Sequence, residues 1–339
     1  MDTGPEDQPQ PLRLFLHIGV HKTGSTSLQL RFSENPDTLK RHGVLYPLGR
    51  FKEYPHQHSE IVAQATEARA GELQSMLSGM HDEAVASACH TVVLSGEEIS
   101  LLPQKRIELL RDALRSAGFS TIVVAFFRPY VDHVRSIISE QMKIRGRFAT
   151  PSGIASWLGR YEGADIAARF ALVFGAENFI RHDLSEGDDS VALFDKDIGL
   201  AADLAAAWVN TRIDFATLSW LNAIKAELDL PLAVPQRLHA KHFEGRSPFT
   251  AAEAAFLAEV ANAIGGEKGA LLKTQSQQLH AKESGLAPIE AQLDYLMRFN
   301  RFVADLRRHM RRRAVRRRLA ALFGKKPAAS SGRESPGNR

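Results

Sequence analysis

The segment over residues 12–27, "LRLFLHIGVHKTGSTS", constrains the fold of this chain more than any other part of the sequence. It begins as an apolar run of strand length, turns through Gly19 and Gly24, and continues into a helical pattern from about Ser25. A glycine-containing turn between a buried strand and a helix directs several backbone N–H groups and the positive end of the helix dipole at one point. We therefore expect an anion site at residues 24–27.

The loop nearly matches the phosphate-binding pattern G-x-x-x-x-G-K-[ST], but Ser25 stands where the lysine is expected. The lysine is Lys22, three residues earlier, and Thr26 keeps the hydroxyl position. Neither later strand ends in the apolar run plus aspartate that holds magnesium in nucleoside triphosphatases. These features favour a metal-free anion donor. The alternatives are a decayed nucleoside-triphosphate site and a turn that only caps a helix.

Two further apolar runs, over residues 91–95 and 121–127, predict buried strands, and the helical pattern over 103–118 connects them. This alternation predicts an α/β fold with a parallel central sheet flanked by helices. Residues 171–184 read as one last helix-to-strand passage, and the rest of the C-terminal half reads as mainly helical. Two helices are expected there, over residues 211–228 and over 250–264, the second with a capping box formed by Thr250 and Glu253 and a stop at Gly265. The predicted organisation is a disordered N-terminus over 1–11, an α/β domain over 12–300, a basic amphipathic helix over 301–326 and a disordered tail over 327–339.

Composition limits the class of protein. A chain of 339 residues with 44% hydrophobic content has enough apolar material for one sizeable core. Its single cysteine, Cys89, excludes an intrachain disulfide framework, fits a reducing compartment and is expected in the core. The acidic, proline-rich start does not read as a secretory signal, and no apolar run approaches the roughly 18 residues of a spanning helix. We expect a cytoplasmic protein.

A second anion site is expected directly after the strand over residues 121–127. Arg128 follows that strand, Pro129 marks the start of a helix, and Ser136 lies eight residues after Arg128, about two turns along the helix. The carboxyl ends of parallel strands share one edge of the sheet, where open α/β sheets bind their ligands. Two anion sites on one edge suggest a nucleotide phosphorylated at two separate positions.

The stretches "HKTGSTS" and "RPYVDHVRS" together resemble the P-loop-like sulfotransferases that use 3'-phosphoadenosine 5'-phosphosulfate, in their bacterial, carbohydrate-type branch. "VVLSGEEIS" and "FGAENFIRHDL" also resemble core strands of that family, although His182 stands where the family often has a tyrosine near adenine. The resemblance implies that the 3'-phosphate contacts Arg128 and Ser136, and that no metal is required. It also implies that the 5'-phosphosulfate contacts Lys22, Thr23, Gly24, Ser25, Thr26 and Ser27.

Sulfuryl transfer needs charge stabilisation on the leaving group and a base for the acceptor proton. Lys22 suits the first role, because a compact ammonium can follow the negative charge that develops on the bridging oxygen. Glu97, just after the 91–95 strand, is the first choice for the base, ahead of Glu98. The alternative base is His58 or His56, since an imidazole has an unperturbed pKa of about 6.5. These residues also have ordinary readings, as a turn cap or Arg128 partner for the glutamates and as solvated side chains for the histidines.

Most of the positive charge of the chain lies near its C-terminus. Residues 301–339 hold thirteen Lys and Arg against two acidic residues, a net of +11, so the total of +4 leaves −7 on the first 300 residues. The predicted helix over 301–326 has apolar positions that include Phe302 and Leu306, and it suits peripheral binding to an anionic membrane. It suits equally well non-specific binding of nucleic acid or acidic glycans, or docking on the acidic body of the chain.

The sequence therefore predicts a cytoplasmic sulfotransferase, with a place at the inner membrane face through the basic helix. Its acceptor is expected to be a hydroxyl on a glycan or glycolipid, and no specific nucleic acid is expected as a partner. The alternatives are a P-loop nucleotide kinase or NTPase with a displaced lysine, and a non-catalytic, membrane-associated protein that retains the fold.

Overall fold

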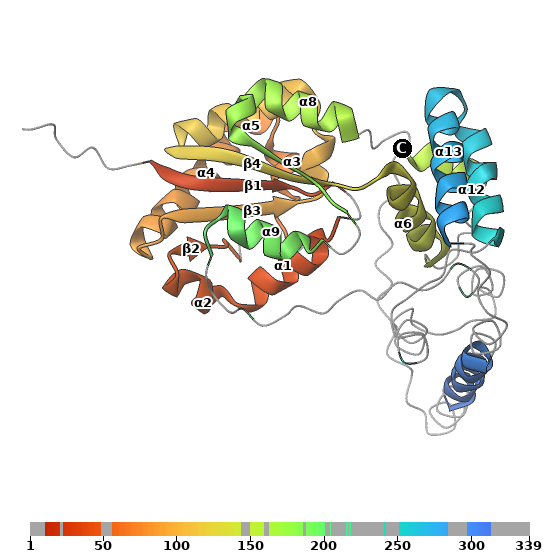
Figure 1. Cartoon of the computed structure of the whole chain (residues 1–339). Helices are drawn as coiled ribbons and strands as arrows, with labels where there is room; N and C mark the ends of the chain where they lie inside the picture. Colours follow the sequence, from red (N-terminus) through yellow and green to blue (C-terminus); the bar gives the residue numbers. More distant parts are fainter. Residues whose placement is uncertain are drawn as a thin grey trace, which may run out of the picture. The chain divides into compact units, whose positions relative to one another are not determined.

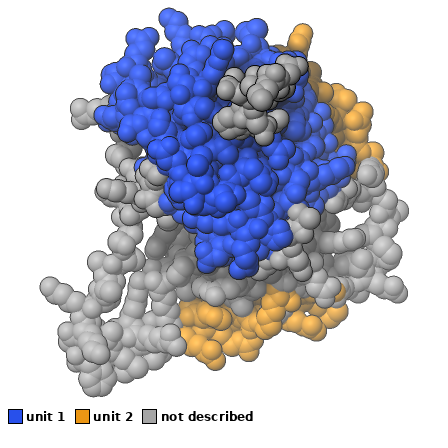
Figure 2. Space-filling model, turned by 90° about the vertical axis from the view of Figure 1, so that its left-hand side faces the viewer, with its two compact units in different colours: residues 1–137, 152–210 blue, residues 138–151, 211–339 orange. Residues whose placement is uncertain are grey.

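The computed structural model describes most of the chain, in several ranges. They are residues 11–20, 23–48, 56–143, 150–158, 163–185, 188–200, 251–283 and 297–312, with the single residues 204, 215, 217 and 241. The contacts divide the chain into two compact units, unit 1 with residues 1–137 and 152–210 and unit 2 with residues 138–151 and 211–339 (Figure 2). The predicted boundary at residue 300 does not coincide with this division, and residues 297–312 are helical across it.

Unit 1 is built on a five-stranded, fully parallel sheet in the order β2-β3-β1-β4-β5 (Figure 1). The strands are β1 (Leu12–Ile18), β2 (Val44–Leu45), β3 (Thr91–Gly96), β4 (Phe119–Phe127) and β5 (Phe179–Asp183). The predicted parallel α/β fold is confirmed, and the apolar runs that predicted strands lie in β1, β3 and β4.

The strand register brings the ends of three strands to one edge. His17 of β1 pairs with Ser95 of β3 on one side and with Val124 of β4 on the other. The turn after β1 therefore leaves the sheet beside the ends of β3 and β4. This confirms the prediction that the glycine loop and Arg128 lie on the same carboxyl edge.

Helices cover both faces of the sheet in unit 1 (Figure 1). Because side chains alternate between the faces of a strand, β1 contributes Phe15 to one core and Leu16 to the other. The face with Phe15 is covered by α1 (Ser25–Glu34), α2 (Pro36–Arg41) and α9 (Ser190–Asp197). The face with Leu16 is covered by α3 (Ile61–Gln64), α4 (Ala70–Ala86), α5 (Gln104–Ser116) and α8 (Gly163–Phe174). Cys89 is buried in the second core, as predicted.

The remaining elements are short turns and the helices around the unit boundary and in unit 2. They are η1 (Glu67–Arg69), η2 (Glu98–Leu101), η3 (Ala176–Asn178), α6 (Tyr130–Lys143), α7 (Pro151–Leu158), α12 (Ala251–Ile264), α13 (Gly266–Glu283) and the helix over residues 297–312. None of the helices in the described ranges is long and apolar enough to cross a membrane.

Glycines end two helices where the sequence predicted that they would. Gly118, two residues after α5, has φ +89°, and Gly265, directly after α12, has φ +68°. Thr250, the predicted cap of α12, lies outside the described residues, as does the predicted helix over 211–228 apart from two helical positions, 215 and 217.

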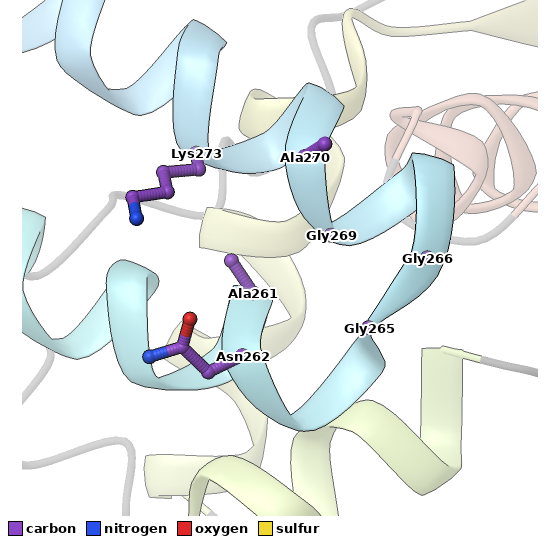
Figure 3. A pocket seen from close by; sticks show the side chains of 7 residues that line it. All are labelled: Ala261, Asn262, Gly265, Gly266, Gly269, Ala270 and Lys273. Carbon is purple, nitrogen blue, oxygen red and sulfur yellow. The ribbon is translucent and has the colours of Figure 1, made fainter.

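In unit 2, α12 and α13 form a tight hairpin. A side chain at Gly269 would collide with the backbone carbonyl of Ala261, so a glycine is needed where the helices meet. Beside the hairpin lies a hollow of about 270 Å³, where Asn262 and Lys273 extend to the same side (Figure 3). None of the residues predicted to bind the donor lines it.

Candidate active site

The loop after β1 is closed by its own hydrogen bonds. The Thr23 hydroxyl is buried and donates to the Val20 carbonyl oxygen at 2.7 Å. Gly24 is the N-cap of α1 with φ +96°, and its carbonyl accepts from the amide of Ser27 at 3.0 Å. The amides of Ser25 and Thr26 precede this first bonded turn and are directed out of the helix end. Lys22, the residue predicted to stabilise the leaving group, lies outside the described residues.

Side chains from other segments pack against the two loop glycines. A Cβ atom on Gly19 would lie 2.7 Å from Ser25 Oγ and 3.0 Å from Glu97 Cγ. A Cβ atom on Gly24 would collide with Oγ of Ser190, the first residue of α9. Both positions therefore need glycine. Ser190 is a neighbour of the loop that was not predicted from the sequence, because its local helix-start pattern does not show which distant segment it contacts.

The Ser25 hydroxyl is the most informative group of the loop. The Ser25 side chain is 3% exposed, and its Oγ has no hydrogen-bond partner in the part of the chain that the structure describes. A buried hydroxyl without a partner costs about 1–3 kcal/mol. Together with the uncapped amides of α1, this hydroxyl fits a cradle that is completed by an anion from outside the chain.

Of the two predicted carboxylates, the structure brings Glu97 to the loop and leaves Glu98 exposed. One backbone hydrogen bond and the Ser100 hydroxyl of η2 connect the loop to the end of β3 and the turn after it. The Gly19 amide donates to the Gly96 carbonyl at 3.1 Å, and the Ser100 hydroxyl donates to the Glu97 carbonyl at 2.7 Å and lies 3.3 Å from the Gly19 carbonyl. Glu97 is half-buried in this position. Its placement fits the predicted preference for Glu97, while its role as the base stays a prediction.

His58 is a buried structural histidine in this fold. Its Nδ1 accepts from the Ser95 amide at 2.9 Å, so Nε2 carries the proton and donates to the Pro47 carbonyl at 3.1 Å. Burial lowers the pKa of His58 to about 4, against smaller raising effects of its backbone hydrogen bonds. This arrangement leaves no ring nitrogen to accept a substrate proton, and it therefore argues against His58 as the base. Glu97 and the half-exposed His56 remain the candidates.

A cluster of buried polar side chains connects the two strands and the helix that flank the loop. The Ser95 hydroxyl lies 2.8 Å from His17 Nδ1 and accepts from Gln29 Nε2 at 3.1 Å, which connects β3, β1 and α1. Burial lowers the pKa of His17 to about 4, although the charge of Glu97 acts in the raising direction. None of these three residues was predicted from the sequence as part of the site. His17 and Ser95 could have been noticed as polar residues near the ends of apolar strands.

The predicted second anion site lies at the end of β4. Arg128 is exposed, Pro129 precedes α6, and Ser136 is half-buried on that helix. Partial desolvation lowers the pKa of Arg128, and the neighbouring charge of Asp132 raises it. Asp132 also forms an ion pair with the buried Arg135 at 3.4 Å. Whether Arg128 and Ser136 hold one phosphate together stays a prediction.

Contacts around α9 complete this side of unit 1. His182, noted above for its place near a predicted adenine site, stacks on Phe126 with ring centroids 5.0 Å apart and pairs with Asp197 at 2.7 Å. Arg31 of α1 pairs with Asp195 of α9 at 2.8 Å, which ties the two helices together. Among the described residues, no group of three or more histidine, cysteine or acidic side chains has the arrangement of a metal site.

Fold and site together define an α/β protein with a five-stranded parallel sheet and a glycine-containing loop at the end of its first strand. Neither a protein-family model nor a curated protein sequence matches this chain. Among solved structures, the chain is similar to a sulfotransferase from Alicyclobacillus acidocaldarius, with a TM-score of 0.37 and 14% sequence identity, over 76% of this chain and 97% of that chain.

Proposed function

We propose that this chain is a sulfotransferase that moves a sulfuryl group from 3'-phosphoadenosine 5'-phosphosulfate to a hydroxyl acceptor. The observation that carries the proposal is the buried Ser25 hydroxyl in the glycine-containing loop, which has no hydrogen-bond partner among the residues that the structure describes. A ligand anion in the loop would give partners to this hydroxyl and to the amides of Ser25 and Thr26. Arg128 leaves the sheet at the same edge and suits a second phosphate of the same ligand.

The residues present suit this donor in their chemistry. The loop offers amide and hydroxyl groups, and Arg128 at the end of β4 offers a guanidinium. At both places the groups are hydrogen-bond donors, which suit anions. A nucleotide with phosphates at its 5' and 3' positions presents anions at two separate places, as this arrangement requires. The donor would supply the activated sulfuryl group, and the chain would supply position, charge and a proton acceptor.

In the transfer, the acceptor oxygen forms a bond to sulfur while the bond from sulfur to the bridging phosphate oxygen breaks. Lys22 would stabilise the charge that develops on that bridging oxygen. Glu97 would take the proton of the acceptor hydroxyl, because its half-buried position against Gly19 puts a carboxylate beside the loop. The proposed acceptor is a carbohydrate or glycolipid, a choice that comes from the sequence resemblance.

Calorimetric titration of the full chain with 3',5'-bisphosphoadenosine, in the absence of divalent metal, tests the proposal. We expect binding, and we expect Arg128→Ala to weaken it by about 10- to 100-fold, since a charge-assisted hydrogen bond contributes about 1.5–3 kcal/mol. Arg115→Ala is the matched control, because Arg115 is an exposed arginine at the C-terminal end of α5 and lies in neither predicted phosphate site.

Three outcomes would contradict the proposal. They are absence of metal-free binding, equal binding by the wild type and Arg128→Ala, and equal losses for Arg128→Ala and Arg115→Ala. Magnesium-dependent binding of ATP in place of the bisphosphate would support the kinase or NTPase alternative. Binding without transfer of labelled sulfate to any of a panel of glycans and glycolipids would support the non-catalytic alternative.

A further inference from the structure

The helix over residues 297–312 turns its apolar side toward protein. Phe302 and Leu306 are 0% and 1% exposed, and Asp305 between them is also buried. The sequence left both a membrane surface and docking on the body of the chain open for the apolar positions that include Phe302 and Leu306. Protein covers these two positions, so they are not available to a membrane.

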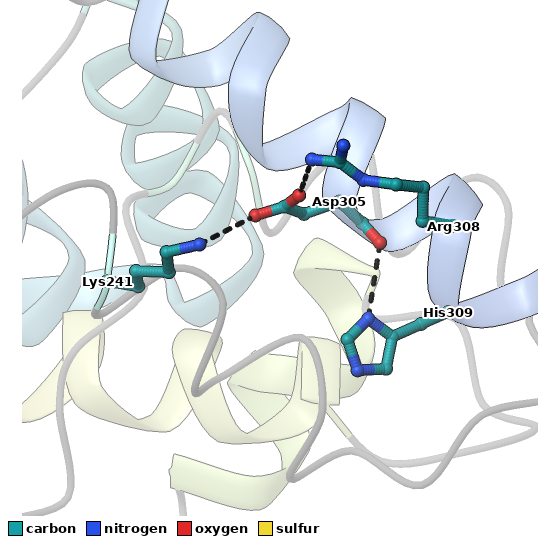
Figure 4. A network of polar contacts seen from close by, with 4 residues as sticks. All are labelled: Lys241, Asp305, Arg308 and His309. Carbon is teal, nitrogen blue, oxygen red and sulfur yellow. Dashed lines mark hydrogen bonds and ion pairs between the residues drawn. The ribbon is translucent and has the colours of Figure 1, made fainter.

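A polar network holds the helix in this rotation within unit 2 (Figure 4). The Asp305 carboxylate accepts from Lys241 Nζ at 3.1 Å and forms an ion pair with Arg308. The Asp305 carbonyl also hydrogen-bonds to His309 Nδ1 at 3.3 Å. Since Asp305 lies on the covered side together with Phe302 and Leu306, these contacts fix which side of the helix faces solvent.

The solvent-facing side is basic and has two apolar members, Met297 and Ala304, of which Met297 is the large one. Met297, Arg301, Ala304 and Arg308 follow the spacing i, i+4, i+7 and i+11, which places them on one side of a helix. Met297 is 52% exposed, and the Arg308 side chain is 68% exposed in spite of its ion pair. We name this surface the arginine face, and it consists of Met297, Arg301, Ala304, Arg307, Arg308, Arg311 and Arg312.

We propose that the arginine face docks on an anionic phospholipid surface, with the helix lying flat and Phe302 and Leu306 remaining in the protein. Guanidinium groups form bidentate hydrogen bonds with phosphate, and basic residues close to an anionic bilayer each strengthen binding. The exposed Met297 favours lipid over nucleic acid or acidic glycan, because an apolar side chain gains by entering the headgroup region. This inference is independent of the proposed transfer reaction.

Co-sedimentation of the full chain with vesicles tests the docking surface. The vesicles are phosphatidylcholine with one quarter phosphatidylserine, compared with pure phosphatidylcholine, at about 0.1 M and 0.5 M salt. We expect binding to the anionic vesicles only, and weaker binding at high salt. Arg307→Gln/Arg311→Gln should lower the partition coefficient by about 25-fold, on the basis of about 5-fold for each basic residue.

The matched control is Arg106→Gln/Arg115→Gln, which removes the same charge from exposed positions on α5. Both double variants keep the basic residues 313–326, so a difference between them reports the arginine face. Met297→Gln should weaken vesicle binding and leave retention on single-stranded DNA or a sulfated glycan unchanged. Unfolding midpoints of all variants should match the wild type, because the changed side chains are exposed.

Equal losses for the two double variants would overturn the proposal, as would equal binding to both vesicle types or no binding to either. Retention on DNA or glycan without vesicle binding would overturn it in favour of a different polyanion. Titration with 3',5'-bisphosphoadenosine should be unaffected by the Arg307→Gln/Arg311→Gln change. Failure of vesicle binding is thereby distinguished from failure of the proposed function.

Discussion

Two helices on the same face of the sheet begin in opposite ways. Helix α9 begins at the N-cap Asp189, whose carboxylate accepts from the Val191 amide at 2.9 Å. Helix α1 begins at Gly24, which has no side chain to cap the first amides. The two starts are close together, since Ser190 at the head of α9 leaves no room for a side chain on Gly24.

This difference is the one expected between a helix start with only a structural role and a helix start that binds an anion. A capped start satisfies its own orphan amides and gains stability, whereas an uncapped start leaves them for an anion. The buried hydroxyl of Ser25 lies at this uncapped start and also lacks a partner among the described residues, which is a second feature expected of an anion site. The comparison predicts that changes at α1 alter ligand binding and that changes at α9 alter stability.

The largest effect is expected when α1 is given the acidic cap of α9. Gly24→Asp in a Ser190→Ala background places a carboxylate in the cradle without the clash against Ser190 Oγ. We expect 3',5'-bisphosphoadenosine to bind on the order of 1,000-fold more weakly, about 4 kcal/mol, because the carboxylate occupies the cradle and repels the ligand. The double variant Gly24→Ala/Ser190→Ala is the control for backbone strain at positive φ. If the aspartate variant bound the ligand within 3-fold of that control, the start of α1 would not be the anion site.

The next effect is the pH dependence of the free energy of unfolding, which the buried histidines His17 and His58 should produce. Burial lowers the folded-state pKa of His17 and of His58 to about 4, below the value of about 6.5 expected in the unfolded chain. The unfolded state therefore binds protons first as the pH falls. The free energy of unfolding should be insensitive to these groups above about pH 6.5 and should fall between about pH 6.5 and 4, by about 3 kcal/mol for each histidine.

Urea unfolding at pH 7 and at pH 4.5 measures this dependence. His17→Gln should show a smaller loss between the two pH values than the wild type, whatever its stability at pH 7. The carboxylates titrate in both proteins, so the difference between the two losses isolates His17. An unchanged loss would mean that His17 is not held neutral below the loop.

A smaller effect is expected from Ser25→Ala, and its sign differs between binding and stability. Ligand binding should weaken by about 10-fold, since one hydrogen bond to an anion is lost. The free energy of unfolding should stay constant or rise by up to about 1 kcal/mol, because a buried hydroxyl without a partner is removed. Calorimetry and urea unfolding check the two quantities. A marked loss of stability would show that the hydroxyl has a structural partner.

The smallest effect is expected from Asp189→Ala, which removes the cap of α9. It should lower the free energy of unfolding by about 1 kcal/mol, as is usual when a capping side chain is lost, and it should leave ligand affinity unchanged. A thermal or urea unfolding curve measures the change in stability, and a calorimetric titration with 3',5'-bisphosphoadenosine measures the ligand affinity. Weaker binding in this variant would mean that the start of α9 belongs to the anion site.

Much of the fold was predictable because its signals are local. The runs in β1, β3 and β4 are apolar over strand length, and Gly118 ends α5 as predicted. Strand β2 was missed, since two residues carry no periodicity. Helix α9 was missed as well, although Asp189 followed by Ser190 resembles an N-cap signal. The division into two units depends on contacts between distant segments, which no local pattern reports.

Local patterns were enough to predict the glycine loop, the succession of strands and helices along the chain around it, and the place of Arg128 after a strand, because each depends on neighbouring residues. The contacts of the folded chain were needed to show that Glu97 lies against the loop, that both ring nitrogens of His58 are occupied and that Phe302 is covered by protein. These outcomes depend on which distant segment packs against each side chain. Burial and hydrogen bonding between distant segments determine which of them pack together, and a local sequence pattern does not report these contacts.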